Sequence, residues 1–311
     1  MRGLHLIPAD INIGFINRKK IFFVFSVLLV IASIGLFASK GLNYGIDFKG
    51  GILIEVKTTD GPADVQAMRG SLSGLGLGEV GLQEFGAPNE VLIRIQAQDG
   101  GEKAQAAAIE KVKAALGGAI EYRRTEFVGP KISDELFWDG VSAVAAAIFA
   151  ILVYVWFRFE WQFGLGAVVA LVHDVISTIG IFALLGLEFN LSTVAAILTI
   201  AGYSINDTVV VYDRVRENLR RYKTMNMTDL LNKSINETLS RTVMTSVTTL
   251  LALLSLYLLG GEVISGFSFA MIWGVIVGTY SSICLAVPLL LYLNVSRRSG
   301  DMSGEATTEE A

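Results

Sequence analysis

Long apolar segments alternate with shorter polar segments along most of the chain. Several of them approach the length of about 20 apolar residues that a helix needs to cross about 30 Å of hydrocarbon. We expect six membrane-spanning helices, at residues 21–39, 138–157, 163–184, 191–212, 242–259 and 267–293. The first segment is longer than the core of a cleaved signal peptide, about 7–15 residues, so we predict that it is a retained helix.

Residues 40–136 are more polar and have the pattern of a separate α/β domain. Strand-like segments lie at 52–56, 80–85, 91–95 and 120–128, and helical segments lie at 62–75 and 102–116. The order β-α-β-β-α-β is that of the ferredoxin-like arrangement. We therefore predict an α-helical membrane protein with a ferredoxin-like α+β domain between its first two helices. The other five helices would form one bundle over residues 137–293.

Basic residues lie near alternate ends of the predicted helices and indicate an orientation. The short loops at 186–190 and 260–266 contain no Lys or Arg, whereas the opposite ends contain Arg18, Lys19, Lys20, Arg158, Arg214, Arg216, Arg220, Arg221, Lys223, Arg297 and Arg298. Because the basic ends of membrane helices face the cytoplasm, we predict cytoplasmic termini. Residues 1–20, the loop 213–241 and a disordered tail at 294–311 would then be cytoplasmic, and residues 40–136 would lie outside. Within that loop, residues 228–240 have the pattern of a surface helix on the inner leaflet.

The composition agrees with a membrane protein and excludes several other classes. Hydrophobic residues make up 52% of the chain and charged residues 17%, whereas about 25% of a soluble domain is charged. A net charge of −4 without a basic surface argues against nucleic acid as a partner. We find no phosphate-binding glycine loop, no zinc-ligand spacing and no catalytic triad. We therefore expect membrane lipid around the chain, no metal or cofactor, and no enzymatic activity.

Asp174 and His173 lie near the middle of the third predicted helix. A charged side chain inside a membrane costs from about 2.5 kcal/mol upward, so it needs a partner or a wet cavity. One interpretation is a protonatable pair on a proton path. The other is a buried hydrogen bond that joins two helices.

Asp207 lies in the inner half of the fourth predicted helix, close in sequence to the polar residues Tyr203, Ser204 and Asn206. Together these side chains could line water inside the bundle. A carboxyl group that binds and releases a proton there would be a proton carrier. The alternative is a structural ion pair.

Arg241 begins the fifth predicted helix, and Thr245 follows it on the same helical face. Arg241 and Asp207 lie toward the same side of the membrane, so their side chains can meet. Because arginine stays protonated, a contact that forms and breaks would control the charge of the aspartate. Alternatively, Arg241 extends to the lipid headgroups. Asp213 and Arg214 mark the cytoplasmic end of the fourth predicted helix, and a solvated or interfacial end explains most of this charge without a function.

A glycine-rich run soon after the first predicted helix, GIDFKGG, resembles the signature of the SecF family, the smaller subunits of SecD/SecF translocases. The positions of this run that we single out are Gly45, Asp47, Phe48, Gly50 and Gly51. Similar runs follow in the family's order: EFVGP at 126–130, YVWFRFEW at 154–161, ALVHDV at 170–175, GYSINDTVVVYDRVREN at 202–218 and SRTVMTS at 240–246. The glycine-rich run itself could be a hinge, a helix–sheet junction or a partner contact.

The resemblance implies a subunit of the Sec translocase in the bacterial cytoplasmic membrane, related in fold to resistance-nodulation-division pumps. It implies pairing with SecD, association with the SecYEG channel and YajC, and action on translocating polypeptide late in export, driven by the proton gradient. The family's fourth-helix aspartate and fifth-helix arginine correspond to Asp207 and Arg241, and Asp174 and His173 fit the family's third-helix motif. Two alternatives are a proton-coupled exporter of small molecules or lipids in the same superfamily, and a purely structural assembly subunit.

Overall fold

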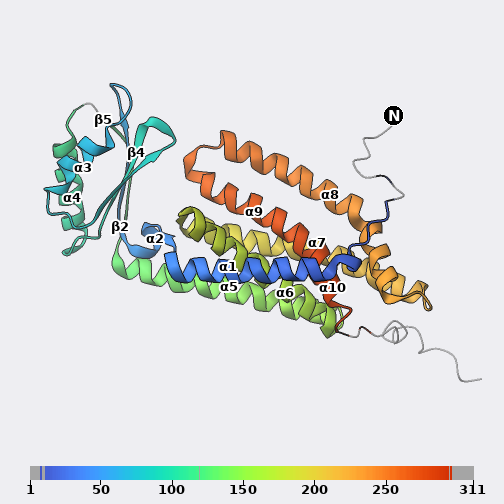
Figure 1. The fold of residues 1–311 in the computed structure, drawn as a ribbon. Helices are drawn as coiled ribbons and strands as arrows, with labels where there is room; N and C mark the ends of the chain where they lie inside the picture. The colour runs from blue at the N-terminus through green and yellow to red at the C-terminus, as the bar shows by residue number, and fades with distance from the viewer. Residues whose placement is uncertain (1–7, 9–10, 119, 294, 296–311) are drawn as a thin grey trace, which may run out of the picture.

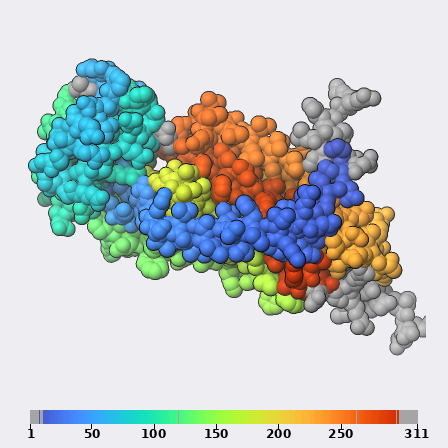
Figure 2. All heavy atoms as spheres, viewed as in Figure 1, coloured from blue at the N-terminus to red at the C-terminus, as the bar shows by residue number. Residues whose placement is uncertain are grey.

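The structure is a computed structural model, and it describes residue 8, residues 11–118, 120–293 and residue 295. Apart from residue 295, the predicted tail at 294–311 therefore lies outside the described residues, as do the first ten residues apart from residue 8. Figure 1 shows an α/β domain at one end of a long helical bundle, while the start of α1 and α10 lie at the opposite end. Figure 2 shows the same domain as a rounded lobe.

Six helices of the described residues are long and apolar enough to cross a membrane, which confirms the predicted fold class. The elements of the bundle are a short 3₁₀ turn (Ile16–Arg18), α1 (Lys19–Lys40), α5 (Pro130–Arg158), α6 (Trp161–Leu185), α7 (Leu191–Arg221), α8 (Met227–Leu259), a second 3₁₀ turn (Glu262–Ile264), α9 (Ser265–Ser281), a π-helical turn (Ser282–Ala286) and α10 (Val287–Leu289).

The connection predicted at 213–241 is mostly helical, and the helix expected at 228–240 is the first part of α8. The structure continues α7 to Arg221 and begins α8 at Met227, so only residues 222–226 connect the two helices. Charged and polar residues at 213–221 and 228–241 end the apolar pattern of each span. They do not end the helices, because Arg, Lys, Glu and Leu are good helix formers in water as well as in lipid. Similarly, α5 begins at Pro130, before its apolar segment.

The α/β domain has the predicted ferredoxin-like topology. Its elements are β2 (Gly51–Thr58), α3 (Val65–Ser73), β3 (Val80–Phe85), β4 (Ala87–Ile95), α4 (Gly101–Leu116) and β5 (Ile120–Val128). The strands form one antiparallel sheet in the order β3-β4-β2-β5. The core lies between one face of the sheet and the helices α3 and α4, where Ile52, Ile54, Ile93 and Leu72 are buried.

Two short elements join the domain to the bundle. β1 (Asn43–Tyr44) pairs in parallel with β6 (Glu188–Phe189), which lies between α6 and α7. A single helical turn, α2 (Ile46–Lys49), follows β1 and leads directly into β2. The domain is therefore attached next to the start of α7, the helix that contains Asp207.

Small residues let the central helices of the bundle approach closely. A Cβ atom on Gly274 of α9 would lie 2.3 Å from the Ile200 side chain of α7, and one on Gly180 of α6 would lie 2.7 Å from the Cα atom of Ser33 in α1. Such contacts between small residues are a common way to pack helices in a membrane. The first contact holds α9 close to α7, and the second holds α6 close to α1.

Candidate functional site

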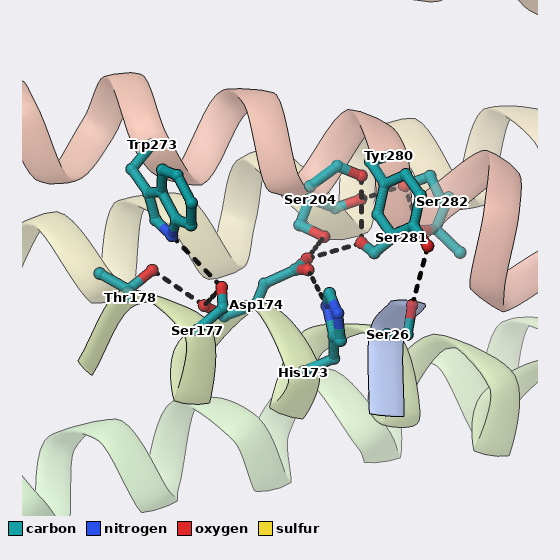
Figure 3. A network of polar contacts seen from close by, with 12 residues as sticks. Ser26, His173, Asp174, Ser177, Thr178, Ser204, Trp273, Tyr280, Ser281 and Ser282 are labelled. Atoms are coloured by element: carbon teal, nitrogen blue, oxygen red, sulfur yellow. Dashed lines mark hydrogen bonds and ion pairs between the residues drawn. The ribbon is translucent and has the colours of Figure 1, made fainter. Parts of the chain in front are cut away.

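Asp174 lies near the middle of α6 and is completely buried. Its Oδ2 accepts hydrogen bonds from the hydroxyls of Ser204 in α7, at 2.6 Å, and Ser281 in α9, at 2.8 Å. Its Oδ1 lies 3.0 Å from Nδ1 of His173. Figure 3 shows these side chains converging on one carboxyl group from three helices. Sequence reasoning included His173 and Ser204 but missed Ser281.

Further polar contacts lie around Asp174. The hydroxyls of Ser177 and Thr178 both donate to the backbone carbonyl of Asp174. Trp273 of α9 donates from its ring nitrogen to Ser177 at 3.4 Å, a contact that is also drawn in Figure 3. Because serine and threonine frequently bond to their own helix, nothing in the sequence distinguished these two from ordinary helix positions.

His173 is 3% exposed, and its Nε2 has no hydrogen-bond partner among the described residues. Its ring lies 6.2 Å from the ring of Tyr280, measured between centroids. The Tyr280 hydroxyl donates to the Phe22 carbonyl at 2.9 Å and lies 3.0 Å from the Ser26 hydroxyl of α1. Polar groups therefore extend from α1 to Asp174, but Tyr280 and His173 are joined by a ring contact and not by a hydrogen bond within the described residues.

Asp207 in α7 is 8% exposed, and its two carboxyl oxygens have different surroundings. Oδ1 accepts a hydrogen bond of 2.6 Å from the Thr242 hydroxyl of α8. Oδ2 is buried and has no partner among the described residues. The nearby Ser282 hydroxyl bonds instead to Thr208, at 2.8 Å, and to the Ser204 carbonyl, at 3.4 Å. The same hydroxyl thus lies between the Asp207 and Asp174 regions.

Arg241 makes no ion pair with Asp207 within the part of the chain that the structure describes. Its side chain is exposed, whereas Thr242, the next residue of α8, is 1% exposed and contacts Asp207. Successive residues of a helix point about 100° apart, because a turn has about 3.6 residues. The sequence therefore indicated the correct turn of α8 for a contact with Asp207 but not the side chain that makes it.

The other predicted polar residues lie on two faces of the bundle. Tyr203 donates to Ser246 of α8 at 3.3 Å, so it belongs to the buried side. Asn206 is exposed. Thr245 is exposed too, and its hydroxyl donates to carbonyls of its own helix, at Arg241 and Thr242. The structure therefore does not bring Asn206 and Thr245 together with the carboxyl groups.

Asp213 and Arg214 form ion pairs on the surface of the molecule. Asp213 pairs with Arg158 at 3.2 Å, and both side chains are nearly half exposed. Arg214 pairs with Glu217 of its own helix at 2.7 Å. Exposed pairs of this kind contribute about 0–1 kcal/mol.

The glycine-rich run forms a helix–sheet junction. Gly45 donates its N–H to the Phe189 carbonyl, and Asp47 Oδ2 accepts from the Leu191 N–H at 2.9 Å, at the first turn of α7. The ring of Phe48 packs on that of Phe189. Gly51 has φ +123°, and a Cβ atom on it would lie 2.5 Å from the Ile95 carbonyl oxygen, so only glycine fits there.

No metal site is formed by the described residues, since they contain no group of three or more His, Cys, Asp or Glu side chains that could hold an ion. The candidate site is therefore a network of carboxyl, imidazole and hydroxyl groups. Groups of this kind can bind, orient and pass protons.

Two family models match the chain. The model of the C-terminal region of the protein export membrane proteins SecD and SecF matches residues 108–296, and that of the SecD/SecF GG motif matches residues 35–61. The protein translocase subunit SecF of Cereibacter sphaeroides is 49% identical and covers 99% of this chain and 98% of its own length. SecF of Rickettsia felis is 48% identical over 92% of this chain and 94% of its own length.

Solved structures point to the same family as these models and relatives. The crystal structure of SecDF, a translocon-associated membrane protein from Thermus thermophilus, matches with a TM-score of 0.83 and 38% identity over 93% of this chain. SecDF in a super-membrane-facing form matches with a TM-score of 0.68 at the same identity, over 96% of this chain. This chain spans 40% of each SecDF chain. With its family model, its relatives and its fold in agreement, the chain belongs to the SecD/SecF protein-export family, as a multi-pass membrane protein related to SecF subunits.

Proposed function

We propose that this chain works with SecD as the proton-coupled subunit of the Sec translocase and drives late steps of polypeptide export. In this proposal the chain itself carries out no enzymatic reaction, and protons are its coupling ion. The observation that supports it best is the buried Asp207 carboxyl group, which has one hydrogen-bond donor and one unpaired oxygen. A buried polar atom without a partner is costly, so this oxygen is suited to take a proton or to bind a group that arrives from outside the chain.

The two aspartates would have different tasks. Asp174 is held by Ser204, Ser281 and His173, so its carboxyl group is fixed in place. Asp207 has a single donor, so it can change partners at lower cost. We assign proton uptake to Asp207, and to Asp174 with His173 a supporting role on the same path, through the hydroxyl of Ser282 that lies between them.

The exposed face beside Asp207 supports a membrane partner. Five residues of α7 and α8 that are exposed in the isolated chain are polar or charged: Thr199, Asn206, Arg241, Thr245 and Thr248. The three threonine hydroxyls already donate to carbonyls of their own helices, so Asn206 and Arg241 carry the argument. Lipid cannot hydrogen-bond to amide or guanidinium groups, so such residues on membrane helices usually face another helix or a wet cavity. We assign this face to SecD, and the proton entrance to the seam between the two subunits.

Arg241 would pair directly with Asp207 in a second arrangement. In this structure its guanidinium group is exposed on the proposed SecD face. A small rotation of α8 that replaces Thr242 by Arg241 beside Asp207 would hold the carboxylate charged. The two SecDF forms match this chain with different TM-scores at the same identity, which supports a fold with more than one arrangement.

We infer the orientation of the chain in the membrane from its basic residues, and this orientation tells from which side protons would enter. With the basic ends cytoplasmic, the α/β domain lies on the outer side of the bacterial cytoplasmic membrane, where protons enter and polypeptide emerges. One charge that crosses 100 mV provides about 2.3 kcal/mol, which is enough to bias a two-state movement of the domain. The SecYEG channel and YajC would be the further partners of the pair.

The test is polypeptide export in membrane vesicles that contain the chain with SecD. Asp207→Asn keeps the shape of the side chain but cannot carry the proton, and Asp213→Asn is the matched control on the same helix. We expect Asp207→Asn to abolish the dependence of export on the proton gradient while the complex stays intact, and Asp213→Asn to behave like the wild type. Unchanged proton dependence in Asp207→Asn would make this chain a structural subunit, and export of a small molecule or lipid without polypeptide export would make it a transporter of another kind.

A further inference from the structure

The end of α7 next to the α/β domain is held by its own capping box and by a residue of the segment that leads into the domain. The first turn of α7 has a capping box, in which the Asn190 side chain accepts from the Thr193 N–H at 3.1 Å. The Leu191 N–H is taken by Asp47, which lies in the glycine-rich run and not in α7. A carboxylate at the start of a helix also interacts favourably with the helix dipole. Movement of α7 along its axis would therefore pull on Asp47.

An ion pair makes a second connection between the same two bodies. Arg94 of β4, an inner strand of the sheet, pairs with Glu188, three residues before α7. The two side chains are 22% and 25% exposed. Arg94 also donates to the Asn43 side chain of β1, at 3.4 Å. Because the pair is mostly buried, removal of either partner leaves a charge without compensation.

The backbone between these two contacts has little freedom. β1 and β6 pair in parallel, with Asn43 opposite Glu188. A Cβ atom on Gly45 would lie 2.5 Å from a Glu188 carboxylate oxygen, so the two segments touch directly. The run then enters β2 through Gly51, where only glycine fits beside Ile95. A displacement at the start of α7 is thus passed to the sheet and is not absorbed in a loose linker.

We propose that Asp47 and the Arg94–Glu188 pair couple α7 to the α/β domain, so that a shift of the helix containing Asp207 moves the domain. The inference rests on the proposed function, because it assigns a task to movement of α7. Asp47, Arg94 and Glu188 are positioning residues, which do not touch the proton. Removal of any of these side chains should lower export and leave proton flux unchanged, whereas removal of the Asp207 carboxyl group should affect both.

The experiment uses vesicles with the full chain and SecD, and measures polypeptide export, proton flux with a pH-sensitive dye, and the amount of intact complex. The variants are Arg94→Ala, Glu188→Ala, Asp47→Ala and the charge swap Arg94→Glu with Glu188→Arg. The matched control is Arg123→Ala, which breaks an ion pair between Arg123 of β5 and Glu90 of β4 inside the same sheet. That pair does not reach the bundle.

We expect each single variant to lower export several-fold while proton flux and complex formation stay near those of the wild type. The charge swap should restore export, and the control should leave all three unchanged. Three results would each overturn the coupling role. The single variants could export as much as the control, they could lose proton flux and export equally, or the charge swap could fail to restore export. Asp207→Asn, measured in parallel, distinguishes the two proposals. Normal export in Asp207→Asn refutes the proposed function. Loss of export in Asp207→Asn together with normal export in the single variants refutes only the coupling.

Discussion

Removal of the serine donors to Asp174 measures how strongly that carboxyl group holds the bundle together. Ser204 and Ser281 are 1% and 0% exposed, and both donate to the same oxygen. A hydrogen bond to a charged group contributes about 1.5–3 kcal/mol. A hydrogen bond between neutral groups of membrane helices averages about 0.6 kcal/mol. Ser204→Ala and Ser281→Ala should therefore each cost about 2 kcal/mol if Asp174 is ionised and about 0.6 kcal/mol if it is protonated.

The double variant should cost more than the sum of the single variants, because the last donor to Oδ2 is then lost and the oxygen stays buried. The assay is reversible unfolding of the purified chain in mixed micelles by titration with a denaturing detergent. Ser255→Ala is the control, since Ser255 is exposed and donates only within α8. If the buried serines match this control to within about 0.5 kcal/mol, the reasoning that Asp174 joins three helices is refuted.

Three further predictions concern the packing and the surface. Gly180→Ala should destabilise the bundle by about 1–3 kcal/mol relative to Gly35→Ala in the same unfolding assay, because its Cβ meets Ser33 of α1 whereas that of Gly35 meets nothing within 4 Å. Equal stability of these two variants would show that α1 does not pack closely on α6. Burial raises the pKa of the Glu188 carboxyl group above its usual 4.5, so the folded protein binds more protons than the unfolded chain just above pH 4.5. The stability of the folded protein should therefore rise as the pH falls toward 4.5, and Glu188→Gln should remove this rise. Parallel profiles of stability against pH for the wild type and Glu188→Gln would contradict the prediction. Asp213→Asn should cost less than about 1 kcal/mol, because its pair with Arg158 is nearly half exposed, and a larger loss would give that pair a structural role.

The architecture could be predicted because its signals are repeated along the chain. Six apolar segments of spanning length and the alternation of strands and helices in 40–136 each depend on many residues, so single exceptions do not change the result. The extension of α7 was missed, and the predicted helix at 228–240 was not joined to the span at 242–259, because hydropathy reports the membrane and not the helix. Residues 213–221 are polar enough to leave the membrane, and they remain helical.

The candidate site could be predicted only in part. Asp174 and Asp207 were found because a carboxyl group in a membrane span is rare. Thr242, Ser281 and Ser282 were not found, because hydroxyl residues are common in such helices. Only the packing of α8 and α9 against α6 and α7 places them beside the aspartates. The π-helical turn at Ser282–Ala286 has no reliable sequence signal, although such turns frequently occur at functional sites.

The role of the glycine-rich run needed tertiary contacts. Its glycines allowed a hinge, a junction or a partner contact equally well. Only the bond from the Leu191 N–H to Asp47, between residues far apart in sequence, shows that the run caps the helix that contains Asp207.

The central claim is that Asp207 binds and releases the coupling proton. Infrared difference spectroscopy of vesicles that contain the chain with SecD observes this directly, as the carbonyl stretch of a protonated carboxyl group that appears when the outer side is acidified. We predict that this band is present in the wild type and in Asp213→Asn and is absent in Asp207→Asn. A band that persists unchanged in Asp207→Asn would contradict the account, because the proton would then be bound elsewhere.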